Sequence, residues 1–173
     1  MTALLNAIDR VCFAAAVLAA FLLAALFVLG LSEIVLRSVF NISLPFVIEY
    51  SGYLLAFVLF LGSGWTLTQG GHIRVTLLSE HVNKRMSRRL DLFCTGAALI
   101  ISSTMTFAFL DFAFGTLIRG TVSFYPSATP LAYPQLVFAS GPLVLTLAFI
   151  ARLIRLLRGD QVEADFTELG DGV

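Results

Sequence analysis

The sequence predicts an all-α membrane protein with four transmembrane helices and both termini in the cytoplasm. Of its 173 residues, 58% are hydrophobic and only 13% are charged, about half the roughly 25% charge that is typical of a soluble domain. The charges are spaced so that four apolar stretches are each long enough to cross a bilayer. Basic residues collect in the segments on one side of these stretches, and this asymmetry predicts the orientation.

The first two predicted spans cover residues 11–32 and 50–70. The first contains no charge from Val11 to Ser32, and as a helix it would extend ~33 Å across a hydrocarbon core about 30 Å thick. It is longer than the apolar core of a signal peptide and lacks a small-residue cleavage motif, so we expect it to remain as a helix. The second span follows Pro45, a residue suited to the first turn of a helix.

The third and fourth predicted spans cover residues 91–112 and 134–154. Asp111 lies near the end of the third span. Proline residues punctuate the approach to the fourth span, and proline cannot donate the backbone hydrogen bond that lipid leaves unreplaced. These prolines are Pro126, Pro130 and Pro134. The approach is therefore predicted to be non-helical and to lie at the membrane interface.

Two extramembrane segments complete the predicted organisation. Residues 74–90 repeat apolar side chains at spacings of three and four, which predicts an amphipathic helix lying in the headgroup region and contacting membrane lipid. Residues 159–173 carry five acids and no base, which predicts a disordered tail.

The distribution of Lys and Arg predicts which side of the membrane each segment occupies. One set of segments carries nine basic residues, namely Arg10, Arg74, Lys84, Arg85, Arg88, Arg89, Arg152, Arg155 and Arg158. The opposite side carries only Arg37 and Arg119. The positive-inside bias then places both termini in the cytoplasm.

Three acids adjoin the predicted spans, and an acid inside a bundle is a functional candidate because an unpaired charge in hydrocarbon is costly. Glu33, Glu49 and Asp111 all map to helix ends. We therefore expect them to be solvated or paired with Arg37 or Arg119. A proton-coupled exporter would need an acid near the middle of the membrane, which none of these positions provides.

The remaining candidate residues point to packing. His72 at the end of the second span has a side chain that titrates near neutral pH, but its commoner role is hydrogen bonding at a helix end. Small residues would allow close helix approach, either internally or to a partner. They are Ala16, Ala20, Ala24, Gly52, Ala56, Gly62 and Gly64. Hydroxyl groups in the spans are expected to bond to their own helix or to a neighbour.

Several classes of function are excluded by what the sequence lacks. It contains no nucleophile and base pair, no phosphate-binding glycine loop and no metal cluster. Its two cysteines lie in separate apolar runs, and its net charge is zero. We therefore expect no enzyme activity, cofactor, disulfide framework, metal or nucleic-acid partner, and a solid bundle that acts as a scaffold.

Three motifs carry a family resemblance: Pro45-x-x-x-Glu49, Phe60-Leu61-Gly62 and Gly71-His72-Ile73-x-Val75. The chain resembles the small membrane subunit, of the DctQ type, of the tripartite ATP-independent periplasmic (TRAP) transporters over roughly residues 10–155. The stretch from Gly120 through Ser123 to Pro130 is similar to the last loop of that family.

The resemblance implies a non-catalytic subunit of a sodium-coupled transporter in the bacterial inner membrane. Its partners would be a large membrane subunit, which moves as an elevator and holds the substrate and sodium sites, and a periplasmic substrate-binding protein. The solute would be a small organic acid or a similar molecule. Glu49, His72 and Arg74 would hold the two ends of the second helix, with Gly62, Arg37 and Pro130 as further structural or interface positions.

Two other hypotheses remain open from the sequence. A self-contained homodimeric exporter predicts efflux that is lost when Glu33, Glu49 or Asp111 is neutralised. A membrane assembly or sensor protein predicts no link to transport and no large polytopic partner.

Overall fold

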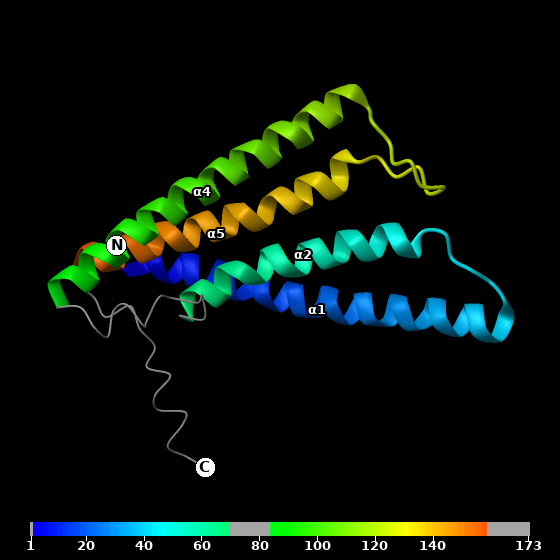
Figure 1. Cartoon of the computed structure of the whole chain (residues 1–173), viewed down its shortest axis with the longest axis horizontal. Coiled ribbons are helices and arrows are strands. Elements are labelled where there is room, and N and C mark those ends of the chain that lie inside the picture. The colour runs from blue at the N-terminus through cyan, green and yellow to red at the C-terminus, as the bar shows by residue number, and fades with distance from the viewer. Residues whose placement is uncertain (1, 70–83, 159–173) are drawn as a thin grey trace, which may run out of the picture.

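The computed structural model describes residues 2–69 and 84–158, which form four helices (Figure 1). They are α1 (Thr2–Phe40), α2 (Val47–Thr68), α4 (Lys84–Arg119) and α5 (Ala132–Arg158). Each helix is long and apolar enough to cross a membrane. For the described residues, the prediction of an all-helical protein with four helices able to cross a membrane is confirmed.

Three of the four helices extend beyond both ends of the predicted spans, whereas α2 begins before residue 50 but ends at Thr68, short of the predicted residue 70. α1 contains 39 residues, so it is about 58 Å long and nearly twice the depth of a hydrocarbon core. The sequence-based limits followed the first charged residues, but a helix continues into the headgroup region, where charges are solvated. α4 begins at Lys84, so the described part of the predicted amphipathic connector is continuous with the third span. The rest of that connector and the acidic tail lie outside the described residues.

The four helices lie side by side in the order α1, α2, α5, α4 (Figure 1). α2 and α5 pack together at the centre, α1 packs on α2 and also contacts α5, and α4 packs on α5. The helices converge where α1 and α4 begin and α5 ends, which we call the basic end. They diverge toward the α1–α2 turn and the loop between α4 and α5, which we call the loop end.

This open layer leaves many large apolar side chains uncovered. Many large apolar side chains on the two outer helices point away from the protein, including Phe93 and Phe107 of α4, which are each 74% exposed. In water such exposure would drive closure of the layer. In lipid it costs little, because the hydrocarbon tails are as apolar as the side chains.

A narrow line of buried apolar residues joins α1 to the centre of the layer. Its members on α1 are Leu5, Ile8, Cys12, Ala15 and Ala19. The sequence favoured the face with Ala16, Ala20 and Ala24, but Ala20 and Ala24 are exposed. The buried face of α1 is therefore one residue away from the predicted face.

Glycine residues set the closest helix contacts. A Cβ atom at Gly64 of α2 would come within 2.8 Å of Val144 Cγ1 on α5. A Cβ atom at Gly141 of α5 would lie 2.4 Å from Phe60 Cβ and 2.9 Å from the Phe60 carbonyl carbon. α2 and α5 thus approach closely at Gly64 and Gly141, as expected for small residues at a membrane helix interface.

Candidate functional site

A buried carboxylate lies at the loop end, where α2 begins. Glu49 in the first turn of α2 is only 4% exposed. Tyr53 Oη, one turn further on, donates to Glu49 Oε1 at 2.6 Å. Ser127 Oγ, from the loop between α4 and α5, donates to the other carboxylate oxygen. Each carboxylate oxygen therefore accepts a hydroxyl hydrogen bond, which offsets the cost of burial.

The loop that supplies Ser127 is ordered by its own backbone. Val122 and Pro130 form an antiparallel bridge, and the Ser123 N–H donates to the Thr129 carbonyl at 2.9 Å. Thr129 Oγ1 also lies 3.2 Å from Tyr50 Oη of α2, within hydrogen-bond distance. The structure therefore places Pro130 in the closed base of a loop that is fastened to α2 at two points.

The structure corrects the expectation for Glu49 while it confirms that for Glu33. Glu49 is buried, pairs with no arginine among the described residues, and accepts its hydrogen bonds from hydroxyl groups. Glu33 forms an ion pair with Arg37 at 2.6 Å and also accepts a hydrogen bond from the Leu44 N–H at 2.8 Å. Ser43 Oγ lies in the same network, 3.0 Å from Glu33 Oε1. The spacing of four residues is enough to predict the Glu33–Arg37 ion pair. The hydrogen bond from the Leu44 N–H can be identified only in the folded structure.

Glu33 and Arg37 hold the turn between α1 and α2. α1 ends at Phe40, and Asn41 follows with φ of 54°, a left-handed conformation that asparagine adopts more readily than most residues. The Ile42 N–H then donates back to the Leu36 carbonyl at 3.1 Å. A carboxylate therefore anchors each connection at the loop end. Glu33 of α1 holds the α1–α2 turn, and Glu49 of α2 holds the loop between α4 and α5.

The other predicted positions are dispersed. Asp111 is exposed on α4, and within the described ranges no ion pair joins it to Arg119. The Arg119 side chain instead lies over Gly115, where a Cβ would be 3.2 Å from the guanidinium. Gly62 faces open space, and a Cβ atom added there would meet no atom within 4 Å. His72 and Arg74 lie outside the described residues.

The hydroxyl groups in the spans bond as expected. Thr66 Oγ1 donates to the Gly62 carbonyl at 3.0 Å, and Thr106 Oγ1 donates to the Ser102 carbonyl at 2.8 Å. Thr106 and Thr146 also meet across the α4–α5 interface, with their hydroxyl oxygens 3.2 Å apart. These groups are used for helix packing.

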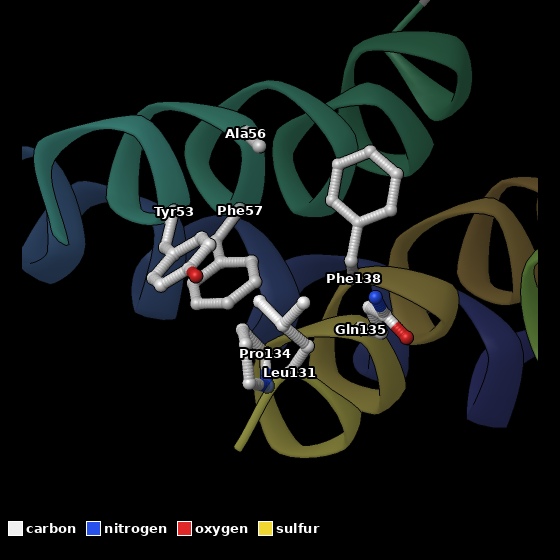
Figure 2. A pocket seen from close by; sticks show the side chains of 7 residues that line it. All are labelled: Tyr53, Ala56, Phe57, Leu131, Pro134, Gln135 and Phe138. Carbon is white, nitrogen blue, oxygen red and sulfur yellow. The ribbon is translucent and has the colours of Figure 1, made fainter. Parts of the chain in front are cut away.

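An apolar cavity of about 210 Å³ lies between α2 and α5. Figure 2 shows Tyr53 and Phe57 of α2 facing Leu131, which directly precedes α5, and Pro134 in the first turn of α5. The other lining residues are Ala56, Gln135 and Phe138. The amide oxygen of Gln135 is buried and has no hydrogen-bond partner in the described part of the chain. The sequence does not reveal this cavity, because its walls come from residues that are distant along the chain.

The cavity is unlike a solute or metal site. Its lining contains no charged residue, so it could not bind an organic acid by ion pairing. Among the residues that the structure describes, no group of three His, Cys, Asp or Glu side chains could hold a metal ion.

The comparisons with known proteins address the chain as a whole. The family model for the DctQ component of tripartite ATP-independent periplasmic transporters matches residues 26–159. No curated protein and no solved structure matches the chain. The match covers all of α2, α4 and α5 and the last part of α1. The chain therefore belongs to the DctQ component family of TRAP transporters, a non-catalytic family of transporter subunits.

Proposed function

We propose that the chain is the static scaffold subunit of a sodium-coupled, binding-protein-dependent transporter that imports a small organic acid or similar solute. Its partners are a large membrane subunit, which holds the substrate and sodium sites, and a periplasmic substrate-binding protein. The chain resides in the bacterial inner membrane with both termini in the cytoplasm.

The observation that carries this proposal is where polar side chains form their hydrogen bonds within the described parts of the spans. Thr66 and Thr106 donate their hydroxyl hydrogens to carbonyls of their own helices, and the cavity between α2 and α5 has an apolar lining. A carrier binds its solute through polar groups that converge near the midplane of the membrane. Members of the DctQ family belong to tripartite transporters, and another subunit of such a transporter would provide the solute site.

The arrangement of the acids disfavours the self-contained exporter. Glu33 and Glu49 anchor the two connections at the loop end through bonds to Leu44 and Ser127. A carboxylate that fixes a turn is a poor proton carrier, because each change of protonation would release the turn. Asp111 is exposed on the outer helix α4.

Reconstitution tests the division of labour between subunits. The chain alone in liposomes should support no sodium-driven solute uptake. Liposomes that contain the chain and its large subunit should take up solute when binding protein and a sodium gradient are present. Omission of the chain should abolish this uptake. Robust sodium-dependent uptake by the chain alone, or purification of the native chain without a large polytopic partner, would refute the proposal.

The orientation has a separate test. Cys94 is exposed and Cys12 is buried, so Cys94→Ser provides a suitable background for labelling. A cysteine in place of Phe124, which is fully exposed in the loop between α4 and α5, should react with a membrane-impermeant maleimide added to intact spheroplasts. A cysteine in place of Arg158 should react only after the membrane is opened. The reverse pattern would overturn the cytoplasmic placement of the termini.

A further inference from the structure

Arginine side chains gather at the basic end, where α4 begins beside the end of α5. Arg88 Nη2 of α4 donates to the Leu156 carbonyl of α5 at 3.0 Å. Deeper along the same interface, Arg152 Nε of α5 donates to Thr95 Oγ1 of α4 at 3.3 Å. Guanidinium groups therefore cross between the two helices in both directions.

Three arginines at this place present their side chains to the surroundings. Arg88 and Arg89 in the first turns of α4 and Arg158 at the end of α5 are exposed. We call these three residues, together with the buried Arg152 (8% exposed), the arginine seam. The bond from Arg88 to Leu156 uses one of the five N–H donors that a guanidinium carries. The seam therefore offers several directed donors at its surface.

Among the described residues, the exposed arginines of the seam outnumber the acids that lie near them. Asp9 of α1 is engaged by Arg155, with Arg155 Nη2 2.5 Å from Asp9 Oδ2, so this pair is close to neutral. Asp91 is half-buried on α4 and is the other acid near this end of the described helices. Within the described helices, one aspartate therefore stands against the three exposed arginines of the seam.

The position of the seam matches the depth of lipid phosphates. No charged residue occurs between Arg119 and Arg152, so the arginines follow directly after the apolar part of α5. Phe93 lies four residues after Arg89 and is 74% exposed, which places an apolar ring on the same face of α4, toward the hydrocarbon. A guanidinium above an apolar surface complements a phosphate headgroup above its acyl chain.

We propose that the arginine seam is a binding site for the headgroup of an anionic phospholipid, with an acyl chain lying along the Arg89–Phe93 face of α4. Arginine binds phosphate oxygens through paired N–H donors, and basic pockets between transmembrane helices recognise anionic headgroups. The bound phosphate bridges α4 and α5 and offsets the repulsion between their arginines. This proposal stands independently of the transport role.

The test uses the purified full chain in a mild detergent. Native mass spectrometry measures how much phosphatidylglycerol and phosphatidylethanolamine of equal acyl length the chain retains. We expect preferential retention of phosphatidylglycerol. In the double variant Arg89→Gln/Arg158→Gln, the preference should fall roughly fivefold for each arginine removed. Within the described part of the chain, neither side chain forms a hydrogen bond or an ion pair. Far-UV circular dichroism checks that the helices are retained.

Matched variants separate a defined site from a general charge effect. Arg119→Gln removes an exposed arginine from the loop end of the same helix and should leave the preference unchanged. Arg89→Lys/Arg158→Lys keeps the charge but loses the paired N–H donors, so it should retain only part of the preference. An unchanged preference in the glutamine variant, or an equal loss in Arg119→Gln, would overturn the proposal. Displacement of the lipid by millimolar inorganic phosphate would also overturn it, since the site would then bind free phosphate.

Discussion

Replacement of Gly141 by alanine should separate α2 from α5. The new Cβ atom would lie 2.4 Å from Phe60 Cβ and 2.9 Å from the Phe60 carbonyl carbon. Carbon atoms in favourable contact are about 3.5–4.0 Å apart, so the helices must move apart locally by roughly 1 Å. Backbone atoms of α2 cannot rotate aside as a side chain can. Overpacking of this kind costs roughly 1–3 kcal/mol, and we expect a loss of stability within that range.

Two other glycines of the same layer provide graded controls. Gly62→Ala meets no atom within 4 Å and should raise stability slightly, by roughly 0.5–1 kcal/mol, because alanine is the better helix former. Gly64→Ala would meet Val144 Cγ1 at 2.8 Å, but this methyl group belongs to a side chain that can shift. We expect its effect to lie between those of the other two variants.

Unfolding by sodium dodecyl sulfate in mixed micelles measures these effects. Far-UV circular dichroism follows the helices, and the fluorescence of Trp65, the only tryptophan, follows the α1–α2 interface where its ring contacts Phe13 at a centroid distance of 5.1 Å. The expected order of stability is Gly62→Ala, wild type, Gly64→Ala and Gly141→Ala. Equal stability of the Gly141→Ala and Gly62→Ala variants would refute the close α2–α5 contact.

Three further predictions concern the loop between α4 and α5 and an ion pair between α1 and α5. Glu49→Gln replaces a charged acceptor of two hydroxyl bonds and should cost about 1.5–3 kcal/mol, which limited proteolysis would detect as faster cleavage in the loop that contains Ser127; unchanged cleavage would contradict the anchoring role. Asp9→Asn and Arg155→Gln should show a coupling of about 0.5–1 kcal/mol in a double-mutant cycle, since the pair is partly exposed, and additive effects would mean that the pair contributes nothing. Ala128→Gly should raise stability by roughly 1 kcal/mol in thermal unfolding, because Ala128 has φ of 44° and the left-handed region is costly for a residue with a Cβ; a loss of stability would argue against that conformation.

The two carboxylates at the loop end show which contacts can be predicted from nearby residues in the sequence and which cannot. Glu33 and Arg37 are four residues apart, and helical periodicity alone predicts their contact, which the structure confirms. Glu49 and Ser127 are 78 residues apart, and no local pattern relates them. The burial of Glu49 therefore does not follow from the sequence, although Pro130 and the start of α2 are both recognisable as structural positions.

The helix faces that carry small residues also separate what the sequence predicts from what only the structure shows. Sequence composition predicts that glycine and alanine allow close helix contacts, and Gly64 and Gly141 do so. It cannot predict which of several such faces is used. On α1 the buried residues include Ala15 and Ala19, while the neighbouring Ala20 remains exposed.

The sequence by itself determined the all-helical class and the four stretches able to cross a membrane, because a charge in hydrocarbon costs several kcal/mol and its avoidance is visible in the order of residues. The resemblance to the family was carried by short motifs, chiefly those of the second span. Only the tertiary structure decided the order α1, α2, α5, α4, the open layer and the placement of Ser127 against Glu49. Those features depend on which helix faces fit most closely, and lipid, unlike water, does not penalise the apolar faces that are left uncovered.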